Sequence, residues 1–233
     1  MNEKFVGIEK LSLVDYEGKL ACTLFTKGCN FKCVFCHNSS LVFDYNLNEI
    51  DEEGVFDYLK KRKNQLDAVV ITGGEPTLMP TLKDKIIKIK HLGYLVKLDT
   101  NGTNPDVIKE LHEQNLIDYI AMDIKSSLIK YPLITDTKVD CENIKKSINY
   151  IINNFKNYEF RTTLIDEFHD FEDIKQIAKL INGADKLYLQ CFIDNGNCIK
   201  KGLNKVDIEK ILNYKKYLEK YVKKVELRNY VYR

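Results

Sequence analysis

The chain has 233 residues, of which 44% are hydrophobic and 30% are charged, and its formal net charge is +2. This length and hydrophobic content allow one large α/β domain, whereas the near balance of charges gives no indication of nucleic-acid binding. No stretch is apolar enough for a membrane span, and no apolar segment typical of a signal peptide follows the first residues. We therefore expect a cytoplasmic protein without a membrane partner. Seven cysteines in such a chain favour metal ligands and free thiols over disulfides.

Strand and helix patterns alternate along the chain. Strands are expected at 5–13, 20–26, 68–72, 95–100, 119–124, 158–165, 187–192 and 225–230. Helices are expected at 51–63, 82–92, 104–114, 140–155, 172–181 and 207–221. Strand and helix alternate six times, which predicts a parallel sheet with helical crossovers. The length suits a partial (β/α)6 barrel with outer helices, built as a single domain over residues 1–233. A doubly wound sheet is the alternative, because periodicity does not distinguish the two.

The loop expected at about 28–46 carries Cys29, Cys33 and Cys36 in C-x3-C-x2-C spacing. Thiolates are soft ligands that suit iron–sulfur clusters, zinc or copper(I). Three of them leave one position of a four-ligand site open, which indicates chemistry at the metal. A structural metal site or a chance spacing is the alternative. The other cysteines form no second cluster motif: Cys22, Cys141, Cys191 and Cys198.

The predicted strands end in glycine or polar residues, where parallel α/β folds place their ligand groups. These residues are Gly73-Gly74-Glu75-Pro76, Asp99-Thr100-Asn101, Asp123, Lys125, Arg161-Thr162-Thr163 and Gln190. A ring of such groups at one face predicts a pocket. Taken singly, the glycines are compatible with a turn, Asp99 and Asn101 with turn formation, and Lys125 with a solvated charge.

The cysteine spacing, with Phe35 before the third cysteine and His37 after it, resembles the radical S-adenosylmethionine (SAM) superfamily, as does the Gly-Gly-Glu-Pro motif. The resemblance implies that the cysteines hold three irons of a [4Fe–4S] cluster and that SAM chelates the fourth. An electron from the cluster would then cleave the C5′–S bond of SAM, and the resulting radical would abstract hydrogen. No side chain is expected to be catalytic beyond these cofactors. Gly73, Gly74 and Glu75 would form the site of the methionyl amino group.

Two further segments resemble the glycyl-radical-enzyme activating enzymes: 98–102, with its Asp-Thr-Asn-Gly, and 122–125, with its Asp-Ile-Lys. The resemblance implies that Asp123 and Lys125 contact SAM, with Lys125 suited to the SAM carboxylate. It places Asp99 and Asn101 at the same cofactor site. Asp99, Thr100 and Asp123 would also ligate a monovalent cation if their oxygens converge.

Four residues each keep two interpretations. Arg161 lies on a predicted core strand and needs a partner, which could be SAM or a neighbouring Asp. Phe35 could stack on adenine or pack into the protein. His37 could contact adenine or form hydrogen bonds within the loop. Glu75 could orient the amino-group site or serve a structural purpose.

Within these enzymes the chain is most similar to the activating protein of anaerobic ribonucleoside-triphosphate reductase, on the evidence of residues 12–18, 28–38 and Leu189-Gln190. It departs from that pattern at Glu17, where the family usually has Pro, and after Phe192, where Arg-Pro is missing. The identity of the client enzyme therefore stays open. The resemblance implies an oxidoreductase of anaerobic metabolism. It would take an electron from a flavodoxin- or ferredoxin-like protein and abstract hydrogen from a glycine of a glycyl radical enzyme.

Two alternatives remain at this point. The first is a radical SAM enzyme that acts on a small molecule, of the carboxy-deazaguanine synthase type, which would need a polar substrate pocket beyond SAM. The second is a non-catalytic metal protein whose cysteine loop carries electrons or holds zinc. This alternative leaves Gly73-Gly74-Glu75-Pro76, Asp123 and Lys125 without a shared purpose.

Overall fold

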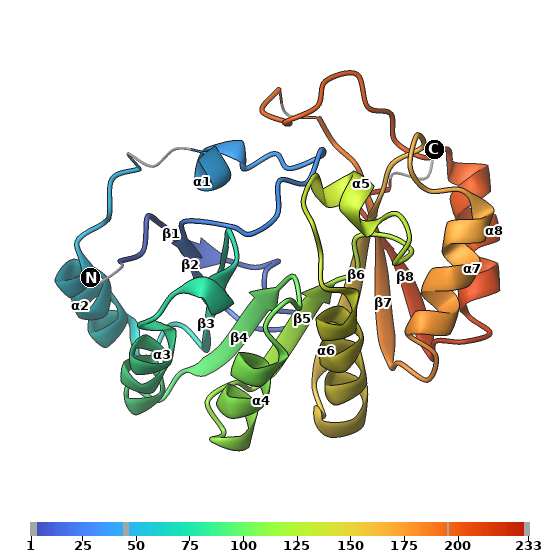
Figure 1. Cartoon of the computed structure of the whole chain (residues 1–233). Coiled ribbons are helices and arrows are strands. Elements are labelled where there is room, and N and C mark those ends of the chain that lie inside the picture. The colour runs from blue at the N-terminus through green and yellow to red at the C-terminus, as the bar shows by residue number, and fades with distance from the viewer. Residues whose placement is uncertain (1–3, 44–46, 195, 231–233) are drawn as a thin grey trace. The chain divides into compact units, whose positions relative to one another are not determined.

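The computed structural model describes residues 4–43, 47–194 and 196–230. Within these ranges eight strands form one sheet in chain order (Figure 1). They are β1 (Gly7–Ser12), β2 (Ala21–Thr26), β3 (Ala68–Gly73), β4 (Leu95–Thr100), β5 (Tyr119–Asp123), β6 (Tyr158–Leu164), β7 (Lys186–Cys191) and β8 (Lys224–Arg228). β1 pairs antiparallel with β2. The pairs β2–β3, β3–β4, β6–β7 and β7–β8 are parallel.

The longer helices lie between the parallel strands, as the alternation in the sequence predicts. They are α2 (Glu52–Arg62), α3 (Leu82–His91), α4 (Pro105–Glu113), α6 (Cys141–Asn154), α7 (Phe171–Leu180) and α8 (Ile208–Leu218). Each begins close to its predicted start. The carboxylates of Asp140 and Asp207 cap α6 and α8 by accepting backbone N–H groups that a helix start leaves without partners. The described part of the chain holds no helix that is long and apolar enough to cross a membrane.

Three short helical segments were not predicted: α1 (Ser39–Phe43), the 3₁₀ helix η1 (Pro76–Leu78) and α5 (Tyr131–Thr135). Segments of three to five residues are too short to show a helical period. α1 interrupts the loop expected at 28–46, and residues 44–46 of that loop lie outside the described residues.

Contacts within the chain divide it into two compact units. The first unit comprises residues up to 30, 40–100 and 106–120, and therefore contains β1 to β4 with α2, α3 and α4. The second unit comprises 31–39, 101–105 and the residues from 121 onward, with β6 to β8 and α5 to α8. The cysteine loop is shared, because Cys29 belongs to the first unit while Cys33 and Cys36 belong to the second.

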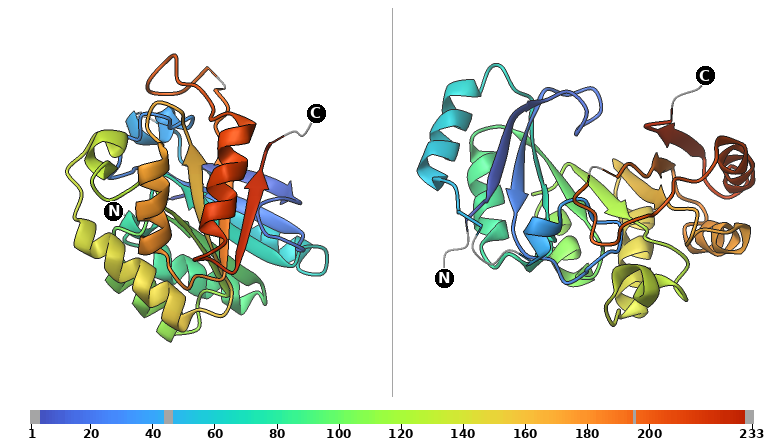
Figure 2. Two further views of the ribbon diagram at one scale, coloured as in Figure 1. Left: turned by 90° about the vertical axis from the view of Figure 1, so that its right-hand side faces the viewer. Right: turned by 90° about the horizontal axis from the view of Figure 1, so that it is seen from above.

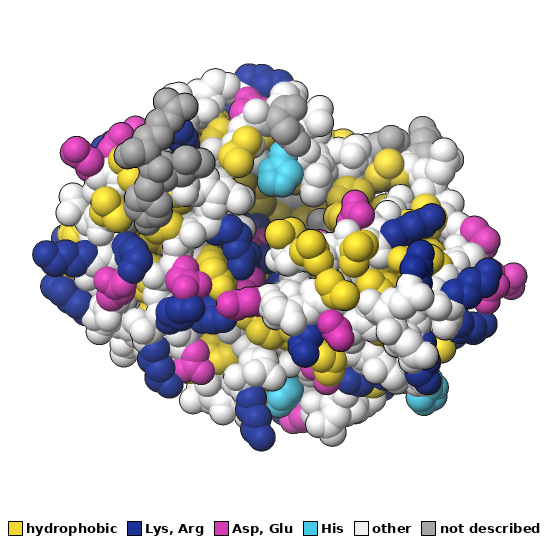
Figure 3. Space-filling view, turned by 180° about the vertical axis from the view of Figure 1, so that it is seen from behind, with side chains coloured by type: hydrophobic (Ala, Val, Ile, Leu, Met, Phe, Trp, Pro, Cys, Tyr) yellow, Lys and Arg dark blue, Asp and Glu magenta, His cyan; other side chains and the backbone are white. Residues whose placement is uncertain are grey.

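The central strands are apolar on both faces, as expected of parallel strands covered by helices. In the first unit, Ala68, Val69, Val70 and Ile71 of β3 are fully buried. In the second unit, α7 and α8 lie side by side along β7 and β8 (Figure 2). Basic and acidic side chains are interspersed on the face seen in Figure 3. Exposed ion pairs such as Lys83–Glu110 and Lys109–Glu113 contribute little stability.

At the carboxyl end of β3 two glycines allow a close approach of backbone segments. Gly73 has a φ of +119°, which disfavours other residues. Gly74 donates its N–H to the Thr26 carbonyl at 2.9 Å, and the next N–H, of Glu75, reaches the Gly28 carbonyl at 2.8 Å. A Cβ at position 74 would lie 1.9 Å from the Gly28 carbonyl oxygen. The backbone just before Cys29 is therefore held against the Gly-Gly-Glu-Pro turn.

We expect Gly74→Ala to lower the free energy of unfolding by about 3 kcal/mol, because the colliding atom is backbone and cannot rotate away. Gly183→Ala is the matched control, since Gly183 has a φ of +86° but no atom within 4 Å of a new Cβ. It should cost only about 1 kcal/mol, from the left-handed backbone alone. Urea denaturation of both variants measures the difference, and equal losses would contradict the proposed collision.

Candidate functional site

In the first unit, the carboxylate of Glu75 accepts hydrogen bonds from neighbouring residues of the protein. The residue is 1% exposed. Its carboxylate accepts hydrogen bonds from the Thr77 backbone N–H at 3.1 Å and from the hydroxyls of Thr77 and Thr100, the latter at 2.7 Å. Glu75 thus caps η1 and ties it to the end of β4, which agrees with the structural interpretation of this residue. Asp99, one residue before Thr100, lies 3.7 Å from the ammonium of Lys97.

Asn101 forms hydrogen bonds within its own loop. Its side-chain oxygen accepts the N–H of Thr103 at 3.0 Å and the Thr103 hydroxyl at 2.7 Å, which closes an Asx turn. Gly102 follows with a φ of +78°, and a Cβ there would lie 2.0 Å from the methyl carbon of Met122. The Asn-Gly pair therefore lets the backbone turn tightly over Met122.

In the second unit, the segment that carries Cys33 and Cys36 is fixed by backbone bonds to α5 and to a distant loop. The N–H of Lys32 donates to the Thr135 carbonyl at 2.8 Å, and that of Val34 donates to the Ile134 carbonyl at 2.9 Å. The N–H of Lys200 reaches the Val34 carbonyl at 2.8 Å. The unpredicted helix α5 is thus one of the supports that hold the cysteine segment in place.

The carboxylate of Asp123, at the end of β5, is held by two cations. The guanidinium Nε of Arg161 on β6 lies 2.8 Å from one carboxylate oxygen, and the ammonium of Lys125 lies 3.0 Å from the other. Burial alone would raise the pKa of Asp123, but Arg161 and Lys125 outweigh it and keep the pKa well below the usual range. The neighbouring Asp that was weighed as a partner of Arg161 is therefore Asp123.

The same lysine faces the cysteine segment. The ammonium of Lys125 lies 5.8 Å from the centre of the Phe35 ring, within range of a cation–π interaction. Phe35 is largely buried, whereas His37 is exposed. Burial raises the pKa of the Cys33 thiol to about 11, and the positive charge of Lys125 acts in the opposite direction. Lys125 therefore interacts electrostatically with three residues of the second unit: Cys33, Phe35 and Asp123.

Arg161 also begins a row of charges that the sequence interpretation missed. Its guanidinium lies 3.9 Å from the Glu159 carboxylate, which is 3.5 Å from the guanidinium of Arg228 on β8. The Arg228 guanidinium lies 3.8 Å from the centre of the Tyr188 ring. Glu159 and Arg161 are two residues apart on one strand, so they share a face. That spacing was the available signal for Glu159, but nothing local indicated Arg228.

All seven cysteines are free of disulfides. Among the residues that the structure describes, no three His, Cys, Asp or Glu side chains are gathered as a metal-ion site. The loop cysteines nevertheless fit an iron–sulfur cluster by chemistry, because they offer three soft thiols within eight residues. Gly74 packs against the backbone that precedes the first of them. The oxygens considered for a monovalent cation are divided between the units, with Asp99 and Thr100 in the first and Asp123 in the second.

Replacing Arg161 by Met should remove the cation that Asp123 and Glu159 share. We expect the free energy of unfolding to fall by about 2 kcal/mol, because each carboxylate loses one charged contact while Asp123 keeps Lys125 and Glu159 keeps Arg228. Arg62→Met makes the same substitution at an exposed position and should change stability by less than about 0.5 kcal/mol. Urea denaturation at neutral pH tests both variants. A loss at position 161 no larger than that at position 62 would show that the ion pairs contribute little.

The sequence and the fold are similar to those of known proteins. Residues 23–181 match the family model described as the radical SAM superfamily. A Methanocaldococcus jannaschii protein that carries the name of a glycyl-radical enzyme activating enzyme is 40% identical over 196 residues, which cover 80% of this chain and 78% of that protein. The pyruvate formate-lyase-activating enzyme of Staphylococcus aureus is 33% identical over 133 residues, which cover 51% of each chain.

A solved structure of Streptococcus suis SuiB bound to S-adenosylmethionine has the same fold, with a TM-score of 0.65 and 18% sequence identity. The likeness covers 85% of this chain and 47% of SuiB. Together with the parallel strand pairs, it confirms the predicted α/β fold of the radical SAM type. The chain therefore belongs to the radical SAM superfamily, whose cofactors are a [4Fe–4S] cluster and SAM, and within it to the glycyl-radical enzyme activating enzymes.

Proposed function

We propose that the protein cleaves SAM reductively at a [4Fe–4S] cluster and abstracts hydrogen from a glycine of a separate enzyme, leaving a glycyl radical there. The observation that carries the proposal is the pairing of Asp123 with Lys125 and Arg161 beside Cys33. This arrangement offers a positively charged ligand contact next to a predicted cluster ligand. The 40% identity to the Methanocaldococcus protein supports the type of reaction.

The charges around Asp123 favour an anionic ligand group. One carboxylate faces two cations, so the trio carries a net charge of +1. Adding Glu159 and Arg228 leaves the sum unchanged. The carboxylate of SAM would neutralise this excess. Lys125 suits that contact, because an ammonium has three donors and can bind the Asp123 carboxylate and a second carboxylate together.

Cys29, Cys33 and Cys36 are the proposed cluster ligands. When bound, the cluster and SAM supply the one-electron cleavage of the C5′–S bond. Phe35, largely buried beside Lys125, and the exposed His37 are proposed to contact the adenine. Gly73 and Gly74 would let the backbone approach the methionyl amino group closely. Arg161 would act on the ligand mainly through Asp123, since its guanidinium already binds that carboxylate.

The remaining predicted residues have smaller proposed parts. Glu75 and Asn101 would shape the loops around SAM, because their side-chain oxygens already accept hydrogen bonds from the protein. Asp99, Thr100 and Asp123 are proposed as ligands of a monovalent cation. The whole chain, 1–233, is proposed to act as one radical SAM core domain in the cytoplasm.

The proposed client is an anaerobic ribonucleotide reductase, and the proposed electron donor is a flavodoxin- or ferredoxin-like protein. The client proposal rests on the similarity of residues 12–18, 28–38 and Leu189-Gln190 to that branch. Gln190 lies on β7 in register with Thr163 of β6 and Arg228 of β8. A polar group from each of these three strands is therefore available to a substrate segment.

Release of 5′-deoxyadenosine tests the proposed reaction. The protein is reconstituted anaerobically with iron and sulfide, reduced and given SAM, and the product is measured by liquid chromatography. We expect product from the wild type and none from the Cys29/Cys33/Cys36→Ala variant. Cys141→Ala is the matched control, because Cys141 lies at the start of α6, outside the cysteine loop, and its loss should leave turnover unchanged.

Addition of a glycine-containing client should then accelerate cleavage and produce a glycyl radical visible by electron paramagnetic resonance. Cleavage without any radical on the reductase would refute that client while leaving the SAM chemistry in place. Absence of product from a wild-type preparation with an intact cluster spectrum would refute the activating-enzyme proposal itself.

A further inference from the structure

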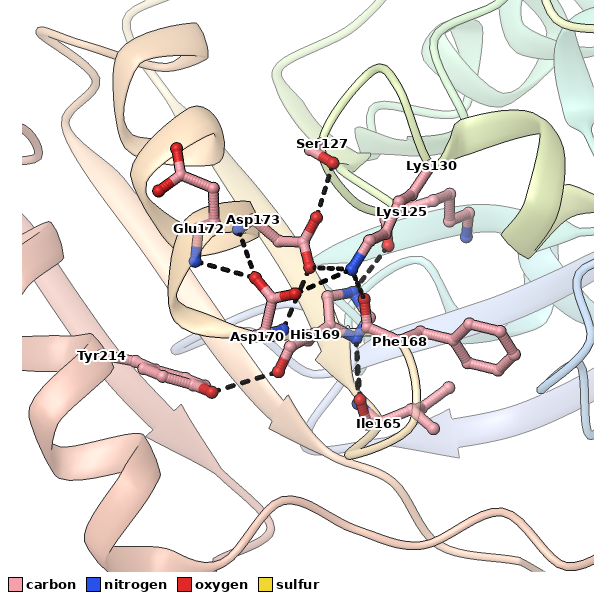
Figure 4. Close-up of polar contacts among 10 residues, drawn as sticks. All are labelled: Lys125, Ser127, Lys130, Ile165, Phe168, His169, Asp170, Glu172, Asp173 and Tyr214. Carbon is pink, nitrogen blue, oxygen red and sulfur yellow. Dashed lines mark hydrogen bonds and ion pairs between the residues drawn. The ribbon is translucent and has the colours of Figure 1, made fainter.

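The segment after β5, which carries Lys125, is tied to the segment after β6 by a group of largely buried polar contacts (Figure 4). The Ser127 hydroxyl donates to the Asp173 carboxylate at 2.7 Å. The ammonium of Lys130 lies 2.5 Å from the Asp173 carboxylate and 3.1 Å from that of Asp170. Asp170 and Asp173 also form the capping box that starts α7. The loop that follows Lys125 is therefore anchored on a helix end.

His169 lies at the centre of this group and is 1% exposed. Its Nδ1 is 3.1 Å from the N–H of Ile165, and its Nε2 is 3.0 Å from the carbonyl oxygen of Lys125. Nδ1 also lies 3.2 Å from the carbonyl oxygen of Ile165. Because the Lys125 carbonyl can only accept, Nε2 carries a ring proton and donates it to Lys125, and in the neutral ring Nδ1 then accepts from the Ile165 N–H. Burial lowers the pKa of His169, which favours the neutral ring that this arrangement requires. Asp173 and Lys130 are the charged groups that face the ring, and they act on its pKa in opposite directions.

The other backbone group of Lys125 is held as well. Its N–H donates to the hydroxyl oxygen of Tyr131 at 3.1 Å, and Tyr131 is fully buried. Two buried side chains thus fix both polar groups of one peptide segment, while the lysine side chain points away from His169 (Figure 4). At its end, the ammonium meets Asp123 at 3.0 Å and faces the Phe35 ring.

We propose that His169 is a positioning residue for the SAM site: by fixing the Lys125 carbonyl, it sets the direction in which the Lys125 ammonium is presented. The inference rests on the proposed function of Lys125 as a contact of the SAM carboxylate. A hydrophobic side chain would fill the same buried space without an N–H to donate, so a purely packing role does not require histidine. Without this anchor the backbone at Lys125 would gain freedom, the ammonium would leave its fixed place beside Asp123, and the anionic ligand would lose a preset partner.

The test compares His169→Leu with His169→Gln in the reconstituted holoenzyme. The Gln amide can both donate to the Lys125 carbonyl and accept from Ile165, whereas Leu can do neither. We expect SAM to bind the Leu variant about tenfold more weakly, the effect of losing one well-placed contact, and the Gln variant within about threefold of wild type. Titration of the reduced cluster's paramagnetic signal with SAM gives the dissociation constant independently of turnover. At saturating SAM, 5′-deoxyadenosine release should be largely retained, so the loss lies in KM.

Two controls separate positioning from stability. Tyr94→Phe removes another buried hydrogen bond to a carbonyl, that of Leu59 in the first unit, and should leave SAM affinity unchanged. Hydrogen exchange of the SAM-free holoenzyme should be faster across 124–130 in the Leu variant but not in the Gln variant. Wild-type affinity in a folded Leu variant, or equal losses in the Leu and Gln variants, would overturn the proposal. Failure of the wild type itself to bind SAM would instead refute the proposed function.

Discussion

The carboxylate of Asp123 lies between Arg161 and Lys125, and the requirement that it stay charged constrains much of the second unit. A partly buried carboxylate is costly unless cations or donors surround it. Arg161 supplies one cation from the neighbouring strand but brings its own need for anions, which Glu159 helps to meet, and Glu159 in turn is paired with Arg228. The charges at the end of β5 are therefore balanced by residues as far along the chain as β8. The network holds two carboxylates and three cations, so its net charge is +1.

The sequence predicted the strands and long helices well, because their apolar residues repeat with the period of the element that buries them. Local chemistry was equally informative where one residue acts alone, as with Asp140 at the start of α6. The prediction was incomplete where a short helix holds a loop in place. α5 has five residues and no detectable period, yet its carbonyls hold the segment between Lys32 and Val34.

In the candidate site, too, some residues were predicted from the sequence and others were not. Asp123, Lys125 and Arg161 were predicted from their places at strand ends, and the structure brings these three together. Their supports could not be predicted, because a bond such as that from His169 to the Lys125 carbonyl joins residues 44 positions apart and leaves no pattern in either segment. Glu75 and Asn101 show the limit of motif resemblance. Their oxygens already accept hydrogen bonds from neighbouring residues, so the motif alone does not separate a ligand contact from a loop former.

The support given to Lys125 bears on the choice between the rival functions. An electron carrier needs ligands that hold its cluster and a surface that meets its partner, but it gains nothing from a lysine fixed at both backbone groups beside the cysteine segment. Fixing a flexible cation costs conformational freedom, and that cost is recovered only if a group of opposite charge binds in a defined place. Asp123 does not by itself account for the arrangement, because Arg161 already binds its other oxygen. A small anionic ligand held next to Cys33 accounts for the excess positive charge and the anchored loop of the second unit together, which favours chemistry on SAM over electron carriage.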